Sequence, residues 1–568
     1  MSSKLSTLSL MKLICVQPIP MPLLFLESTN DDPVAKQKSL TAPLTRTTAA
    51  TGSGTQLNKV VSNGGDRPGL EHTGTGSSMG SLTAVSRLTS AGGDDGKIIY
   101  PFRIKHLGHE IFTLYASSAQ ERAAWCSAII EAKTRHARAL HAQNAEPFRL
   151  RVISDGAFAY DSTSMQGRQP NVSIRGTPLD RAIREMEQVY GPGRGAPPVS
   201  RATVNCACAF TSFGKSLIAI GTDYGVYISE TSNPRGWTRS VQISKVTQIA
   251  VLEDFSVCLL VADRSLISYP LDVIAPVSNF PAPSHDNPRR APQRLAKDVA
   301  FFATARMKDR MLLFYKRKEG MHNTFKVLEP VFQKATEKKS RLFSGRRGGS
   351  GTTESFRDFD EFYIPTDCFS LNLFQNYIAV ATSKGFELLT LDKKVTQSIP
   401  RDLSQPATAN IASRIKEPHP LGMFKLNDQE FLLTYGDCAV YVDKHGEISR
   451  TLIMEYSGKQ RKARAATMFG QYLLLFNDDY VEVRNAENGR LRQIIAGRDV
   501  RCLDYGFRGP TGSGPAGGGG AGLAGVQPPV GAQQDSKGTV KICMSHPEVV
   551  GGQIVLEMLL NDGHAEKA

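Results

Sequence analysis

The sequence predicts a mainly β protein in which a β-propeller, with seven blades favoured, follows a small, interrupted β module closed by one helix. Short apolar runs separated by turns with Gly or Asp recur from about residue 201 to 562, as in radial β arrays. The chain has 568 residues, too many for one ordinary core, and its 50 glycines and 31 prolines indicate loop-rich structure. The hydrophobic fraction of 40% is typical of a soluble globular chain.

The first 140 residues predict a small β module that is split in two. Alternating apolar runs predict strands at Lys12–Val16, within residues 1–30, and at Ile98–Ile104 and Glu110–Tyr115, within residues 98–140. Two or three strands with one helix do not make a stable domain alone, so we expect the module to be partial.

An insert separates the two halves of this module. Residues 31–97 are rich in Ser, Thr and Gly, and no aromatic residue occurs between Phe25 and Tyr100. Such a segment cannot bury enough apolar surface to offset the entropy of ordering it, so we expect it to be disordered.

A helix is predicted directly after the second half of the module. Ser118 and Glu121 have the spacing of a capping box, and Trp125 and Ile129 lie on one face of the helix. We expect Trp125 to be a core aromatic residue.

A second helix is predicted over 177–190, inside a linker that covers 141–200. Thr177 suits the N-cap, Pro178 suits the first helical position and Gly191 suits the exit. An apolar stripe follows one face of this helix: Leu179, Ala182, Ile183 and Met186. Such a stripe predicts packing against the domain that follows.

The propeller prediction over 201–562 rests on repeated hairpins. In one of them, Ser216–Ile220 leads through a turn with Gly221 and Gly225 into Val226–Ser229. Further strand pairs of this kind are Gln248–Leu252 with Ser256–Val261, Tyr377–Ala381 with Phe386–Thr390, Phe431–Tyr435 with Ala439–Val442, and Tyr472–Phe476 with Tyr480–Val483.

Length arithmetic favours seven blades. Two low-complexity inserts, 335–355 and 508–536, are expected to be disordered and do not contribute to blades. Without them each of seven blades would have about 44 residues, within the range typical of four-stranded blades.

Two stretches near the N-terminus resemble one known module. Glu121–Cys126, with Trp125, resembles the end of a pleckstrin homology domain, in which that Trp plugs the open barrel. Cys15–Leu24 resembles the mid-domain strand and loop of the same module in fungal Rho guanine-nucleotide exchange factors. The first strands, where the family places residues that hold phosphoinositide headgroups, have no counterpart here.

The propeller region resembles the citron homology domain, in particular that of the fungal exchange factors. The stretches that carry the match are Ile218–Tyr227, Asp367–Asn372, Ala379–Glu387, Leu432–Val442, Val540–Pro547 and Gln553–Glu557. The resemblance implies a C-terminal part of such a factor: a truncated pleckstrin homology module and a citron homology domain.

This resemblance implies a non-catalytic regulatory and protein-interaction region in small-GTPase signalling, in the context of cell wall integrity, actin and polarity. Family members exchange nucleotide through a helical Dbl homology domain, which we expect to be missing from this chain, so we expect no enzyme activity. Two alternatives stay open: an active exchange factor as part of a longer product, and a peripheral lipid-binding scaffold at the membrane.

The partners expected are proteins, a Rho-family GTPase first among them, and no nucleic acid. No stretch approaches the roughly 18 uninterrupted apolar residues of a membrane span, so we expect a cytoplasmic chain, with peripheral association at the plasma membrane as the alternative. The net charge of +14 permits weak contact with an anionic membrane surface.

We expect no catalytic, cofactor-binding or metal site. His106 and His109 flank an expected hairpin turn, and no further ligand pair accompanies Cys206 and Cys208, although both would project to one face of a strand. The nine cysteines are spread along the chain, which fits a reducing compartment.

The residues singled out are structural or basic. Gly221, Gly225, Gly385 and Gly436 are expected to shape the hairpins, and Trp125 the core of the small module. One insert carries a basic cluster that is either a solvated loop or a contact for an anionic surface: Lys334, Lys338, Lys339, Arg341, Arg346 and Arg347.

Overall fold

The computed structural model describes residues 24–27, 34–35, 98–106, 111–161, 173–192, 197–276, 291–319, 322–332, 355–417, 419–458, 462–506 and 538–564. The chain forms two compact units. One comprises 1–28, 103–112 and 127–568, and the other comprises 29–102 and 113–126.

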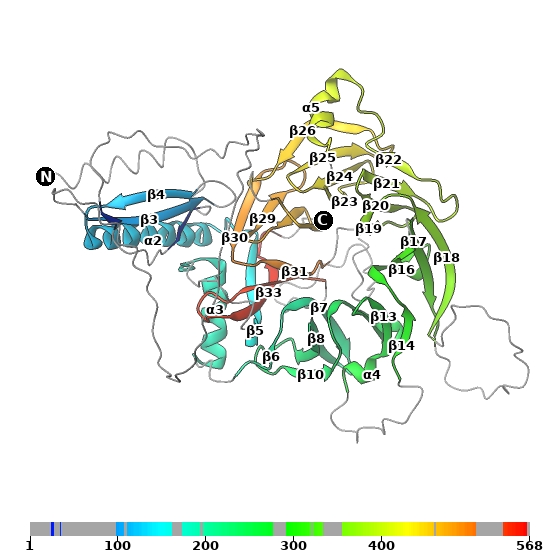
Figure 1. Cartoon of the computed structure of the whole chain (residues 1–568), viewed down its shortest axis with the longest axis horizontal. Helices are drawn as coiled ribbons and strands as arrows, with labels where there is room; N and C mark the ends of the chain where they lie inside the picture. Colours follow the sequence, from blue (N-terminus) through cyan, green and yellow to red (C-terminus); the bar gives the residue numbers. More distant parts are fainter. Residues whose placement is uncertain are drawn as a thin grey trace, which may run out of the picture. The chain divides into compact units, whose positions relative to one another are not determined.

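The larger unit contains a propeller whose seven blades surround a common centre in Figure 1. The first six blades are four-stranded antiparallel sheets with strands in chain order. Blade 1 contains β7 (Val204–Ser212), β8 (Lys215–Thr222), β9 (Gly225–Glu230) and β10 (Thr238–Val241), and blade 2 contains β11 (Val246–Leu252), β12 (Val257–Ala262), β13 (Ser265–Pro270) and β14 (Gln293–Ala296). Blade 3 contains β15 (Val299–Met307), β16 (Arg310–Glu319), β17 (His322–Pro330) and β18 (Phe356–Ile364).

The next three blades repeat this plan. Blade 4 contains β19 (Cys368–Leu373), β20 (Ile378–Thr382), β21 (Gly385–Leu389) and β22 (Gln397–Ile399), and blade 5 contains β23 (Pro420–Lys425), β24 (Glu430–Tyr435), β25 (Cys438–Asp443) and β26 (Ile448–Glu455). Blade 6 contains β27 (Ala465–Phe469), β28 (Tyr472–Phe476), β29 (Tyr480–Asn485) and β30 (Leu491–Ala496). The predicted seven-bladed, mainly β architecture is confirmed.

The seventh blade closes the ring with strands from both ends of the propeller sequence. Here β31 (Arg501–Asp504), β32 (Val540–Ser545) and β33 (Gly552–Leu560) are joined by β5 (Phe148–Ala159) and β6 (Ser200–Arg201). Strand β5 pairs antiparallel with β33, from Gly552 opposite Ala159 to Leu560 opposite Phe148. The stretch 141–200, predicted as a linker with one helix, thus also contains β5, whose partner strand lies some four hundred residues further along the chain.

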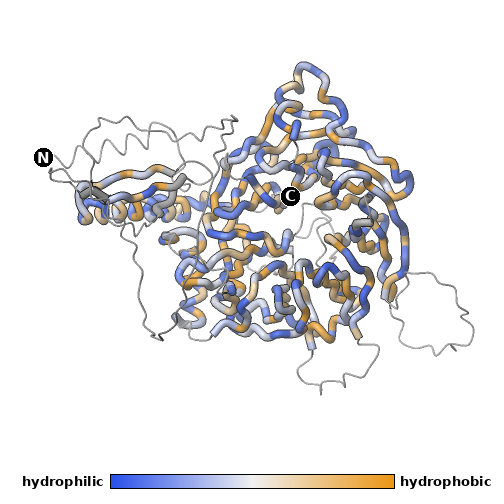
Figure 2. Tube along the Cα trace, in the orientation of Figure 1, coloured by the Kyte–Doolittle hydropathy of each residue, from blue (hydrophilic) through white to orange (hydrophobic). Residues whose placement is uncertain are grey.

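Seven apolar clusters hold the blades together, one at each junction between neighbours. The junction of blades 7 and 1, for example, buries Phe158 of β5 against Tyr227 and Trp237 of blade 1, with ring centroids 5.5 and 5.4 Å apart. Figure 2 shows the apolar stretches recurring through the blades. This apolar burial is the main source of the ring's stability.

Helix α3 (Pro178–Tyr190) has the predicted bounds and packing. The Thr177 side chain accepts a hydrogen bond from Asp180 N at 3.4 Å, and Gly191 ends the helix with φ +80°. The predicted apolar stripe is buried in the cluster shared with blades 6 and 7. In the described connections of the blades lie the short helices α4 (Leu271–Ile274) and α5 (Ala409–Arg414) and the 3₁₀ turns Glu253–Phe255 and Pro406–Thr408.

The N-terminal elements are β1 (Leu24–Glu27), β2 (Val34–Ala35), β3 (Ile98–His106), β4 (Ile111–Ala116) and α2 (Ala119–Ala142), with β3 paired to the three other strands. The strands predicted at Ile98–Ile104 and Glu110–Tyr115 correspond to β3 and β4. The strand predicted at Lys12–Val16 lies outside the described residues, as does the 31–97 insert apart from β2.

The capping of α2 follows the predicted spacing with one change. Glu121 N donates to Ser118 Oγ at 3.0 Å, but the Glu121 carboxylate accepts from Ser117 N at 2.8 Å instead of from Ser118. Trp125 is half-buried on this helix, which has no fully buried residue. Its role as the plug of a pleckstrin-type barrel stays a prediction.

Candidate functional site

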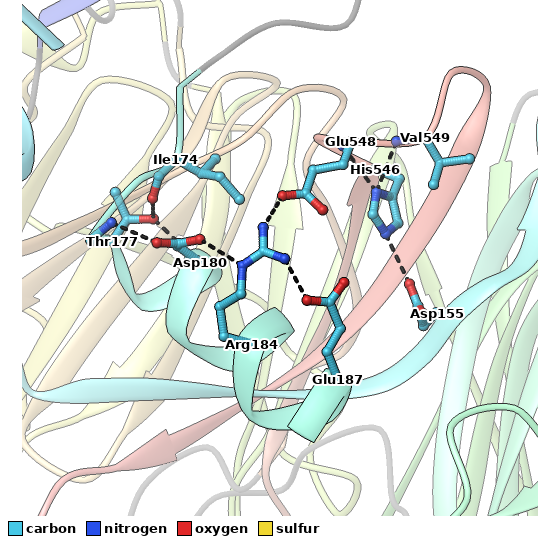
Figure 3. A network of polar contacts seen from close by, with 10 residues as sticks. Asp155, Ile174, Thr177, Asp180, Arg184, Glu187, His546, Glu548 and Val549 are labelled. Carbon is cyan, nitrogen blue, oxygen red and sulfur yellow. Dashed lines mark hydrogen bonds and ion pairs between the residues drawn. The ribbon is translucent and has the colours of Figure 1, made fainter. Parts of the chain in front are cut away.

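A buried histidine–carboxylate pair, His546 and Asp155, is the first arrangement to weigh as a catalytic centre (Figure 3). His546 Nε2 lies 2.9 Å from Asp155 Oδ1, and neither side chain is exposed. His546 Nδ1 accepts hydrogen bonds from Glu548 N at 3.1 Å and Val549 N at 3.2 Å, so the proton sits on Nε2 and is donated to the carboxylate. Both ring nitrogens are occupied and shielded from solvent, so the imidazole fixes the β32–β33 turn.

Arg184 connects helix α3 to the same turn (Figure 3). Its guanidinium contacts Asp180 at 3.4 Å and pairs with Glu187 on the helix and with Glu548 in the turn. The Arg184 side chain is half exposed, so this network positions the helix more than it stabilises the fold. Sequence reasoning missed the pairing with Glu548 because this residue lies 364 positions from Arg184 in the chain.

The glycines predicted to shape the hairpins occupy two kinds of position. Gly225 and Gly385 follow the β8–β9 and β20–β21 turns with φ +146° and +118°. In both turns a threonine hydroxyl, of Thr222 or Thr382, donates to the glycine carbonyl at 3.1 or 3.0 Å. The same hydrogen bond from a threonine to a positive-φ glycine thus recurs in blades 1 and 4.

Gly221 lies where the chain passes close to a neighbouring side chain, whereas Gly436 does not. A Cβ at Gly221 would stand 2.5 Å from Cys206 Sγ, so the strand needs glycine to pack there. A Cβ at Gly436 would stand 3.4 Å from His419 and Lys462 side-chain atoms, an ordinary contact.

The cysteines of blades 1 and 2 form part of an apolar core. Cys206, Cys208 and Cys258 are buried in the cluster between these blades, and burial raises the pKa of Cys208 to about 12. In the described part of the chain, no three His, Cys, Asp or Glu side chains gather as metal ligands would. The His106 and His109 side chains and the basic cluster Lys334–Arg347 lie outside the described residues.

A groove at one rim of the propeller is the best candidate for a protein-binding site. Its walls come from the β7–β8 turn, the β11–β12 turn and the described ends of the β13–β14 and β17–β18 connections, which lie at the same end of their blades. Phe213 and Phe332 are 67% and 65% exposed there. Phe255 stacks on Phe332 with ring centroids 4.5 Å apart. The cavity has a volume of about 650 Å³.

Three carboxylates line the same groove as these aromatic rings. Glu253, Asp254 and Asp272 line the groove. Glu253 accepts a hydrogen bond from Thr211 N at 2.8 Å, which fixes the turn of blade 1 to that of blade 2, and Asp254 lies 3.6 Å from Arg306. Among its described residues, the groove therefore combines exposed apolar rings with carboxylates, on a chain whose net charge is +14.

Sequence reasoning did not single out these groove residues. Phe213, Phe255 and Phe332 belong to three different blades and come together only through the ring. A local signal existed at Phe213, since an aromatic residue in a hairpin turn has no strand face to bury it.

The described chain thus forms a seven-bladed propeller with an aromatic-lined groove at one rim. A model of the CNH domain matches residues 214–506, more than half of the chain, and the chain therefore belongs to this family. The chain is also homologous over most of its length to fungal Rho1 guanine nucleotide exchange factors.

Two relatives from Schizosaccharomyces pombe illustrate this homology. Rho1 guanine nucleotide exchange factor 3 is 28% identical over 433 residues, which cover 71% of this chain and 32% of the relative. Rho1 guanine nucleotide exchange factor 1 is 27% identical over 447 residues, covering 77% of this chain and 29% of the relative. The chain thus spans about a third of the length of these relatives.

Among solved structures, that of the AfRom2 CNH domain matches with 22% identity and a TM-score of 0.46, covering 63% of this chain and 95% of that one. Among the described residues, no helix has the length and apolar character that a membrane span requires.

Proposed function

We propose that this chain acts as a non-catalytic interaction region in the regulation of a Rho-family GTPase, and that the rim groove of blades 1 to 3 is where its protein partner docks. The observation that carries the proposal is the stack of the half-buried Phe255 on the exposed Phe332, in a groove that the exposed Phe213 also lines. Exposed aromatic residues in a concave surface are the usual anchors of protein interfaces.

The partner proposed first is the GTPase itself. The relatives are named for exchange on Rho1, and a region of such a factor that holds the GTPase would keep it near the exchange reaction. The negative rim of the groove favours a partner surface with Lys or Arg around an apolar side chain. Roles in cell wall integrity, actin organisation and polarity belong to the same proposal.

We propose further that the residues described here do not exchange nucleotide themselves. Exchange in the family is performed by a helical Dbl homology domain. Among the described residues only α2 and α3 exceed six residues in length, and neither belongs to a helical bundle. The exchange reaction would then depend on another domain or another chain.

Binding to purified Rho1 from Schizosaccharomyces pombe tests the proposal. Biolayer interferometry with the full chain and with Rho1 loaded with GDP or with GTPγS gives the affinity. The double variant Phe213→Ser, Phe332→Ser is expected to weaken binding at least about tenfold, because it removes exposed aromatic anchors. The control is Tyr363→Ser, which removes a ring that is 58% exposed on β18 but outside the groove.

Two outcomes would count against the proposal. If neither the GDP-loaded nor the GTPγS-loaded form of Rho1 bound detectably, the GTPase would not be the partner. If Tyr363→Ser weakened binding as much as the double Phe variant does, the groove would not be the docking site. Release of a fluorescent GDP analogue from Rho1 is followed in parallel. Acceleration of this release by the chain alone would support the exchange-factor alternative instead.

A further inference from the structure

A recess lies on the rim opposite to the aromatic groove, at the seam where blades 7 and 1 close the ring. One wall is formed by Val199 and strand β6 of blade 7, and the other by the β8–β9 turn, β10 and the connection to β11 in blade 1. The recess has a volume of about 540 Å³. Among the described residues, its lining contains Arg201 and Arg239 but no Asp or Glu.

These two arginine side chains have no polar partner within the described part of the chain. Arg201 and Arg239 are exposed, on β6 and β10, and neither makes an ion pair or a side-chain hydrogen bond with a described residue. Other exposed arginines of the propeller do find carboxylates, as Arg264 does with Asp298 at 3.6 Å. The two guanidinium groups therefore leave a local charge of +2 facing solvent in a concave site.

A buried hydroxyl completes the site. Ser200 lines the recess with only 6% of its surface exposed, and its Oγ has no hydrogen-bond partner among the described residues. Buried polar groups are nearly always hydrogen-bonded, so this hydroxyl keeps an unused capacity to donate and accept at the recess. The amide of Gln242 and the hydroxyl of Ser244 line the same recess and can donate as well.

We propose that this recess binds a phosphorylated side chain of a protein partner. Two arginines match the nearly double negative charge of a phosphate monoester, and guanidinium groups bind its oxygens in a bidentate manner. A carboxylate has one charge and two oxygens, and it would leave part of this donor set unused. The site is separate from the aromatic groove and does not depend on which partner occupies the groove.

The surroundings of the recess favour a peptide over a lipid headgroup. Val199 and Tyr224 flank it with 45% and 53% of their surfaces exposed, and they offer apolar contacts to residues beside the phosphorylated one.

The test uses the full chain and peptide libraries of random sequence around one fixed phosphoserine, phosphothreonine or phosphotyrosine, each with an unphosphorylated counterpart. We expect one phosphorylated library to be retained and its counterpart not to be. For peptides so selected, Arg201→Gln and Arg239→Gln are each expected to weaken binding at least about tenfold, as expected for lost hydrogen bonds to a charged group. Arg264→Gln, an exposed arginine on the same rim outside the recess, is the matched control.

Ser200→Ala separates binding from folding. This variant removes an unsatisfied buried hydroxyl, so the thermal midpoint is expected not to fall while peptide affinity drops several-fold. Retention of both forms of every library alike, or equal weakening by Arg264→Gln, would overturn the proposal. Vesicles containing phosphoinositides form the last arm, and binding to them that depends on Arg201 and Arg239, without phosphopeptide binding, would replace the peptide by a lipid.

Discussion

The Gln493 side chain holds both backbone groups of Phe148. Its Oε1 accepts a hydrogen bond from Phe148 N at 2.9 Å, and its Nε2 donates one to Phe148 O at 2.8 Å. Gln493 lies on β30 of blade 6, and Phe148 begins the strand β5 that completes blade 7. A second glutamine acts on the other side of the seam, where Gln553 accepts from Val204 N at 3.0 Å and donates to Ala202 O at 2.8 Å. Ring closure is thus fixed by glutamine amides as well as by apolar burial.

Replacing Gln493 by Ala is expected to destabilise the propeller by about 2–4 kcal/mol, because two buried backbone groups of Phe148 lose their partner. Urea denaturation measures the change in the free energy of unfolding. The control is Gln429→Ala, an exposed turn position, which should stay within about 0.5 kcal/mol of the unmodified chain. Equal effects of the two substitutions would show that the hydrogen bonds from Gln493 to Phe148 do not contribute to the stability of the fold.

The two positive-φ hairpin glycines should respond differently to alanine. At Gly385 a Cβ meets no atom within 4 Å, so Gly385→Ala carries only the backbone strain, roughly 1–2 kcal/mol. At Gly225 the Cβ would lie 2.3 Å from Val241 O, so Gly225→Ala also forces β9 and the end of β10 apart. Thermal unfolding of the two variants should therefore show a clearly larger loss for Gly225→Ala, and equal losses would contradict the close approach of these strands.

His546→Ala is expected to destabilise the chain by about 3–5 kcal/mol, since it leaves the buried carboxylate of Asp155 without its imidazole donor. Asp155→Asn should cost less, because an amide oxygen still accepts the proton of Nε2. A double-mutant cycle on chemical denaturation gives the coupling between the two side chains, expected at about 1–3 kcal/mol. A coupling near zero would mean that the pair contributes only through packing.

Local patterns predicted the repeated part of this fold well. The hairpin Ser216–Ser229 and the helix 177–190 were predictable because the turn residues and the apolar spacing that define them are close in sequence. The number of blades could be predicted from the length of the propeller region because all blades have a similar number of residues.

The seam of the ring was not predictable in the same way. Phe148, Leu150 and Val152 alternate as a strand should, but nothing nearby in the sequence indicates that β33 is their partner. The His546–Asp155 pair and the recess with Arg201 and Arg239 also join residues from distant parts of the chain. Closure in three dimensions, which no local pattern encodes, creates these sites.

Lys133 gives the stability of the chain a dependence on pH. This lysine of α2 lines a small pocket with Ile174 and Ile495, and burial lowers its pKa from the usual 10.5 to about 8. The folded chain therefore binds this proton more weakly than the unfolded chain does. Between pH 8 and 10.5 the unfolded state holds more protons, so this lysine makes the free energy of unfolding rise with pH across that window.

Lys133→Met removes the ammonium group and keeps an unbranched apolar stem. The variant is expected to be more stable than the unmodified chain at pH 7, where the full cost of burying the charge is present, and the difference should shrink as the pH approaches 10.5. Urea denaturation at pH 7, 9 and 10.5 measures it. Lys215→Met serves as control, because Lys215 is 60% exposed and pairs with Glu230 on the surface, so its small effect should not follow this pH window. A stability difference for Lys133→Met that is constant with pH would mean that the ammonium is solvated in the folded chain.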